Sequence, residues 1–127
     1  MRISKLIVLC AFIASGCVPL LLGAGAVTGY MLSNDYALGN VKTDYRTLWD
    51  VSLDVVSTPE FNIIEVNESK GIIKVKDSDV DVGIKIDSLE VDEQRLKVSA
   101  RKYLIPQSRY AQKIFFRIIR ELEMELE

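Results

Sequence analysis

Residues 80–101, VDVGIKIDSLEVDEQRLKVSAR, hold the pattern that decides the fold of this 127-residue chain. Valine or isoleucine occupies every second position over 80–86, with polar residues or glycine between, and 96–100 repeats the alternation. Successive side chains of a strand point to opposite faces, so each segment is predicted to be a strand with one buried and one wet face. The acidic turn at 90–93 joins the two strands as an antiparallel pair.

Two further strands are expected just upstream, over residues 61–66 and 72–76. They flank the segment 67–71, which has the composition of a hairpin connection. Its last residue, Gly71, stands where a positive backbone angle is needed. The four strands together predict an antiparallel meander.

Residues 43–57 are predicted to form an amphipathic helix, because their apolar residues recur at steps of three and four. Thr43 or Asp44 can cap its start, and Thr58 with Pro59 ends it, since proline disfavours a helical residue before it. The apolar positions are Tyr45, Leu48, Trp49, Val55 and Val56.

A second helix is expected after Pro106, with Ser108 as its cap. Phe116 and Ile119 lie beside its apolar stripe, and we interpret them as widening the core-facing side; the alternative is an exposed contact patch. The stripe itself consists of Ala111, Ile114, Phe115, Ile118 and Leu122.

The predicted fold is therefore α+β: a two-layer sandwich in the order helix, four-stranded antiparallel sheet, helix. Both helices must bury their apolar stripes, and the one apolar face of the sheet is the surface available to them. We expect this domain to span residues 41–127.

The amino terminus has the features of a bacterial lipoprotein signal. Arg2 and Lys5 precede an apolar run at 6–12, and Ala14, Ser15, Gly16 and Cys17 form a lipobox. We expect cleavage between Gly16 and Cys17, which makes 1–16 a signal peptide, and acylation of Cys17. The alternative is an uncleaved anchor helix within 6–32, a stretch long enough to cross a hydrocarbon core of about 30 Å.

Residues 17–40 are interpreted as the lipidated cysteine followed by an apolar tether that reinforces anchoring. Two other interpretations remain open: the segment lies in the bilayer surface, or Gly25 and Gly29 allow close helix contacts. Val18 replaces the aspartate that commonly retains lipoproteins in the inner membrane. The expected location is the outer membrane facing the periplasm in a Gram-negative cell, or the outer leaflet of the single membrane in a Gram-positive cell.

Composition argues against several function classes. Histidine is absent, Cys10 lies in the predicted signal and Cys17 would carry lipid, so the commonest general base, metal ligand and thiolate nucleophile are missing. With 16 basic and 18 acidic residues, nucleic acid is not an expected partner. Neither an enzymatic activity nor a cofactor is expected.

The acidic triplet Asp77, Asp79 and Asp81 is similar to the start of a calcium loop. Val82 stands where that loop needs glycine, and Ser88 stands where it needs glutamate. We therefore expect a solvated turn leading into a strand, and no metal site.

A group of basic residues is predicted to share the open face of the sheet. One interpretation is a binding face for an anionic partner such as lipid headgroups, lipopolysaccharide or an acidic protein. The favoured interpretation is a solvated face whose charges suppress edge pairing. The residues are Lys74, Lys76, Lys85, Lys97 and Arg101.

The lipobox, the Gly- and Ala-containing stretch after it and the helix, four-strand, helix order resemble a family of short bacterial lipoproteins, the domain of unknown function 3568. The segment 18–22 is bulkier than the small-residue run typical of that family. The resemblance implies lipidation at Cys17 and assigns no activity.

These observations predict a non-enzymatic, membrane-anchored lipoprotein of the bacterial envelope that acts as a structural or accessory interaction module. Its expected partners are the membrane and another envelope protein or lipid. The alternatives are a module that binds lipid or envelope polymer through the open basic face, and an uncleaved, helix-anchored periplasmic protein. The oligomeric state is left open.

Overall fold

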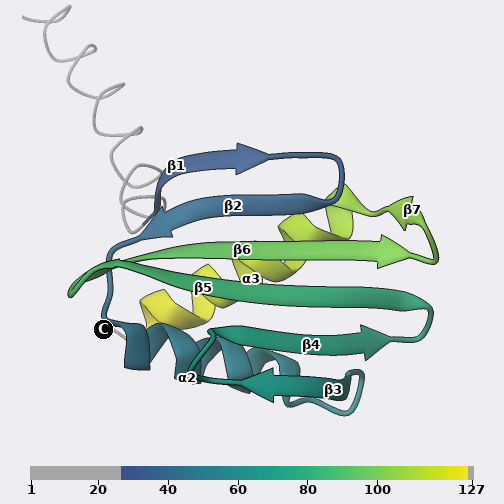
Figure 1. Cartoon of the computed structure of the whole chain (residues 1–127), viewed down its shortest axis with the longest axis horizontal. Helices are drawn as coiled ribbons and strands as arrows, with labels where there is room; N and C mark the ends of the chain where they lie inside the picture. Colours follow the sequence, from purple (N-terminus) through teal and green to yellow (C-terminus); the bar gives the residue numbers. More distant parts are fainter. Residues whose placement is uncertain (1–26, 126–127) are drawn as a thin grey trace, which may run out of the picture.

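The computed structural model describes residues 27–125, which form an α+β domain with two helices and one antiparallel sheet (Figure 1). The strands lie in the order β1-β2-β6-β5-β4-β3, and β7 pairs with the end of β6. The elements are β1 Val27–Leu32, β2 Tyr36–Val41, α2 Tyr45–Val56, β3 Asn62–Asn67, β4 Ile72–Asp77, β5 Val80–Glu90, β6 Glu93–Lys102, β7 Ile105–Pro106 and α3 Ser108–Glu125.

The predicted central elements are confirmed. The four expected strands are β3 to β6, and the two expected helices are α2 and α3. Asp44 caps α2, where its carboxylate accepts a hydrogen bond from the Thr47 amide at 3.1 Å. Gly71 ends the β3–β4 turn with φ +68°, as its place in the hairpin predicted.

The predicted number of strands, four, was wrong. β1 and β2 extend the sheet beyond β6, and the short β7 adds a further pairing. The predicted domain boundary after residue 40 falls inside β2, so much of the expected tether belongs to the sheet. The alternative anchor helix within 6–32 cannot extend to residue 32, because residues 27–32 are a strand.

The strand signal of β2 is weak because two of its three core-facing positions are small. Ala37 and Gly39 carry little of the valine and isoleucine signal that marks a strand. A Cβ on Gly39 would lie 2.8 Å from the Phe115 ring, so glycine here lets α3 approach the sheet closely. β2 is placed by pairing with the distant β6, where Tyr36 lies opposite Ser99.

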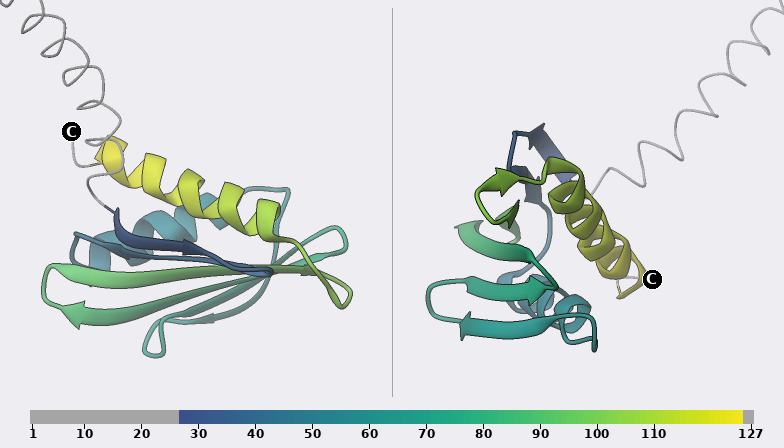
Figure 2. Two further views of the ribbon diagram at one scale, coloured as in Figure 1. Left: turned by 90° about the horizontal axis from the view of Figure 1, so that it is seen from above. Right: turned by 90° about the vertical axis from the view of Figure 1, so that its right-hand side faces the viewer.

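Both helices cover the same face of the sheet, which gives the two layers seen in Figure 2. α3 packs on β6 and β2, α2 packs on β5 and β6, and the helices contact each other. Leu48, Phe115 and Ile118 are fully buried between the layers. Ile119 also lies in the core, as expected, whereas Phe116 is 39% exposed and its predicted core role was wrong.

Candidate functional site

The five basic residues singled out in the sequence all lie on the open face, the sheet surface turned away from both helices. Strand register places them in three adjacent rows. Lys76, Asp81 and Arg101 form one row. Lys74, Gly83 and Ser99 form the next, and Lys85 beside Lys97 the third. The topology therefore brings together cations that are up to 27 positions apart in the chain.

The centre of the open face is hollowed at Gly83 and Ser99, the two small residues of the middle row. A Cβ on Gly83 would lie 2.9 Å from Ser99 Oγ, so the two residues form a tight floor. The depression has a volume of about 400 Å³. Its rim includes Asp35, Ile64, Lys74, Lys97, Arg101 and Tyr103.

Two of the five cations are engaged by neighbouring groups. Arg101 donates to Asp35 Oδ2 from Nε at 3.0 Å and Nη2 at 2.5 Å. This hydrogen bonding holds the pKa of the Asp35 carboxyl below its ordinary value. Lys85 Nζ donates to Asp87 Oδ1 and to the Lys70 carbonyl, each at 2.8 Å. Both cations therefore stabilise the domain locally.

The other three cations are available to a partner. Lys97 Nζ lies 4.6 Å from the centre of the Tyr36 ring, a cation–π contact that leaves its hydrogen-bond donors free. Over residues 27–125, no ion pair involves Lys74 or Lys76. These lysines can donate hydrogen bonds to phosphate, sulfate or carboxylate groups laid across the hollow.

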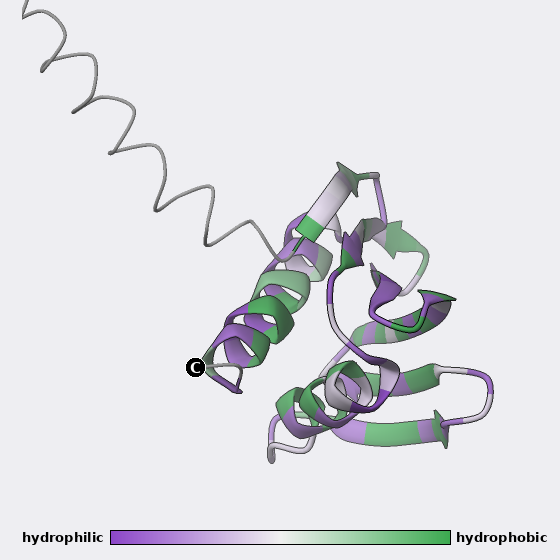
Figure 3. Cartoon of the chain, turned by 90° about the vertical axis from the view of Figure 1, so that its left-hand side faces the viewer, coloured by the Kyte–Doolittle hydropathy of each residue, from purple (hydrophilic) through white to green (hydrophobic). Residues whose placement is uncertain are grey.

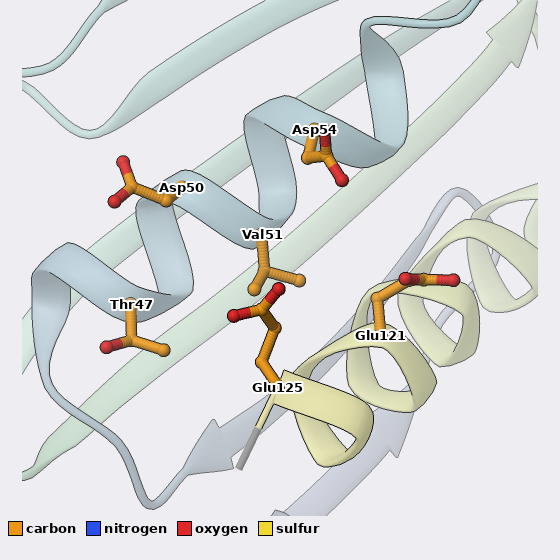
Figure 4. A pocket seen from close by; sticks show the side chains of 6 residues that line it. All are labelled: Thr47, Asp50, Val51, Asp54, Glu121 and Glu125. Carbon is orange, nitrogen blue, oxygen red and sulfur yellow. The ribbon is translucent and has the colours of Figure 1, made fainter. Parts of the chain in front are cut away.

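A second depression, of about 350 Å³, lies between the helices (Figure 4). Asp50 and Asp54 from α2 and Glu121 and Glu125 from α3 line it together with Thr47 and Val51. Asp50 is 3.3 Å from Arg46 of its own helix. Across the described range, 27–125, no group of three or more His, Cys, Asp or Glu residues is arranged to hold a metal ion.

Sequence reasoning missed two polar contacts on the helix-covered side of the sheet. The Tyr110 hydroxyl donates to Asp77, so the first acid of the triplet ties β4 to α3. Burial, followed by this bond, raises the pKa of the Tyr110 phenol. Gln94 is fully buried and donates to the Thr43 and Glu90 carbonyls at 3.2 and 3.0 Å. Neither contact has a local motif.

The predicted cleavage and lipidation residues, Gly16 and Cys17, lie outside the described residues. Within the part of the chain that the structure describes, neither helix has the length and apolar character needed to cross a membrane.

Comparison with known proteins identifies one family. A model of the family described as "Protein of unknown function (DUF3568)" matches residues 1–102. No curated protein matches the chain. Among solved structures, the chain is similar to a conserved protein of unknown function from Enterococcus faecalis, with 12% identity and a TM-score of 0.44. The match covers 84% of this chain and 80% of that one.

Proposed function

We propose that this chain, which belongs to the DUF3568 family, is a lipid-anchored, non-enzymatic protein of the bacterial envelope. Its domain binds or braces another envelope component. The observation that carries the proposal is the lipobox ending at Cys17, ten residues before the first strand begins at Val27. A diacylated, N-acylated cysteine holds a small domain at a membrane without any spanning helix.

The lack of enzymatic activity is inferred from composition. The chain has no histidine, and its cysteines are the lipid carrier and one residue of the predicted signal. Nucleophilic and general acid–base catalysis would need other groups with shifted pKa values that converge on a cavity. The lysines of the open face have the chemistry of a binding surface.

Intact-mass measurement of the membrane-extracted protein tests the anchor. We expect loss of residues 1–16 and the added mass of acyl chains. Cys17→Ser should abolish lipidation and retention in the membrane fraction, whereas the matched control Cys10→Ser should change neither. A Cys17→Ser protein that is still trimmed and retained would contradict the proposal.

Affinity capture from detergent-solubilised envelopes tests the interaction role. The wild-type protein is expected to recover the same envelope component in repeated captures. If the protein is retained in the membrane but captures no partner reproducibly, the lipid anchor is supported and the interaction role is contradicted.

A second candidate function is favoured by the depression over Gly83 and Ser99: binding of an anionic lipid or envelope polymer. Lys74→Glu with Lys76→Glu should abolish binding to lipopolysaccharide or anionic polymer, because both lysines lack ion pairs within 27–125. Lys42→Glu with Lys70→Glu, which reverses two exposed charges outside the three rows of the open face, is the matched control. Unchanged binding by the double variant would refute this candidate.

A further inference from the structure

The solvent-facing side of α3 combines cations with exposed apolar residues. Arg109, Lys113 and Arg120 are exposed, and helical spacing puts them on one stripe opposite the buried side. Phe116 and Met124 lie on the same stripe and are 39% and 62% exposed. We call these five residues the α3 outer stripe.

The cations of the α3 outer stripe, Arg109, Lys113 and Arg120, form no ion pairs within residues 27–125. Arg117, toward α2, is instead paired with Glu60 at 2.9 Å. The acids Glu121 and Glu125 line the groove toward α2, and the half-buried Glu123 borders the stripe. The three charged residues of the stripe itself are all basic.

β1 widens the apolar part of this surface. It lies beside α3 (Figure 3), and the Tyr30 ring packs 5.1 Å from the Phe116 ring and 5.3 Å from the Phe115 ring, centre to centre. Tyr30 is 37% exposed. Tyrosine and phenylalanine beside lysine and arginine are the residues that favour the boundary between lipid headgroups and acyl chains.

The point where the chain enters the domain is on this side of the molecule. Val27, the first residue of β1, is ten residues after Cys17. Ten residues span at most about 35 Å even when fully extended. The anchor proposed above therefore keeps β1 and the neighbouring α3 close to the membrane.

We propose that the α3 outer stripe, with Tyr30, docks on the anionic phospholipid surface of the membrane that holds the Cys17 lipid. This inference rests on the proposed lipid anchor. Lys113 and Arg120 contact headgroup phosphates while Phe116 enters the boundary region. Because α3 and the open face belong to opposite layers, docking turns Lys74, Lys76 and Lys97 away from this membrane, toward a partner.

The test uses the full-length, membrane-extracted protein reconstituted into phosphatidylcholine vesicles with or without phosphatidylglycerol. A single cysteine carrying an environment-sensitive fluorophore replaces Met124 on α3 or, as the matched control, Lys76 on the open face. Spin-labelled lipids should quench the probe at position 124 in anionic vesicles and leave the probe at 76 unquenched. High salt should weaken the quenching, because it screens surface charge.

Removing charges from the stripe measures how much electrostatic attraction contributes to docking. Each Lys or Arg near an anionic surface increases the ratio of docked to undocked protein about fivefold. Lys113→Gln with Arg120→Gln should therefore lower the ratio of docked to undocked protein about 25-fold. Lys42→Gln with Lys70→Gln, which removes two exposed cations elsewhere, should leave the ratio unchanged.

The outcomes separate the two proposals. Protein that is attached to vesicles but unquenched at 124, or equally quenched at 124 and 76, overturns the docking inference and leaves the anchor intact. Protein that does not attach at all overturns the anchor and the inference with it. Quenching at 124 that is independent of phosphatidylglycerol overturns the inference, because the stripe then does not recognise anionic lipid. Disulfides that form between copies of the same variant when its cysteine at 124 is left unlabelled mean that a second copy covers the stripe, which also overturns the inference.

Discussion

Replacing Gly71 with alanine should destabilise the domain far more than the same change at Gly29. Both glycines have positive φ, +68° and +61°, so alanine suffers a left-handed backbone penalty of about 1 kcal/mol at either site. Their surroundings differ. A Cβ on Gly71 would lie 2.2 Å from the Ile86 carbonyl oxygen, whereas at Gly29 its nearest neighbour, Asn40 Nδ2, is 3.9 Å away.

The steric conflict at Gly71 explains why the expected loss in the free energy of unfolding is larger there than at Gly29. The carbonyl oxygen of Gly71 accepts the Ile86 amide at 2.8 Å, so relieving the clash pulls apart the bond that joins the β3–β4 turn to β5. Losing this hydrogen bond costs about 1 kcal/mol, and displacing the buried backbone adds about 1 kcal/mol more. We expect Gly71→Ala to lower the free energy of unfolding by about 3 kcal/mol and Gly29→Ala by about 1 kcal/mol.

Urea unfolding of the full chain in a mild non-ionic detergent measures both values. Trp49 is the only tryptophan and is 3% exposed, so its fluorescence reports the loss of the core. With a slope near 1.5 kcal/mol per molar urea, the midpoints of the two variants should differ by about 1 M. Equal midpoints would refute the reasoning, because the clash with Ile86 is the main steric difference between the two sites.

Three further changes test the frame of the domain. Phe115→Ala, at a side chain with no exposed surface, should lower the free energy of unfolding by about 3–5 kcal/mol in the same urea assay, and a loss below about 1 kcal/mol would show that α3 is not packed as described. Tyr110→Phe removes the hydroxyl that donates to Asp77 and should cost about 1–2 kcal/mol; an unchanged midpoint would exclude a stabilising role for this bond. The lowered pKa of Asp35 means that its pairing with Arg101 stabilises the fold fully above the unfolded value of about 3.9 and is lost as the pH falls through the lower folded value. Asp35→Asn should therefore lower stability at neutral pH and flatten the decline in stability measured from about pH 5 to about pH 2, and an unaltered pH profile would contradict this assignment.

The sequence predicts which residues share the open face. It does not predict which of them are paired or where the face is hollowed. Strict alternation along 80–101 places Lys85, Lys97 and Arg101 on one side of any sheet that buries the valines and isoleucines. Only strand register puts Gly83 beside Ser99 and creates the hollow. Arg101 pairs with Asp35, which is 66 positions away in the chain, and no local sequence pattern predicts this pairing.

The sequence by itself determined the central meander, both helices, a cap at Thr43 or Asp44 and the need for glycine at 71, because each follows from periodicity or from turn chemistry within a few residues. Tertiary structure alone decided that 36–41 joins the sheet beside β6, that β1 extends it, and that Phe116 stays exposed. The physical reason is the range of the interactions. β2 has a weak intrinsic strand signal and becomes a strand through hydrogen bonds to β6, about 60 residues away, and through the close fit of Phe115 over Gly39.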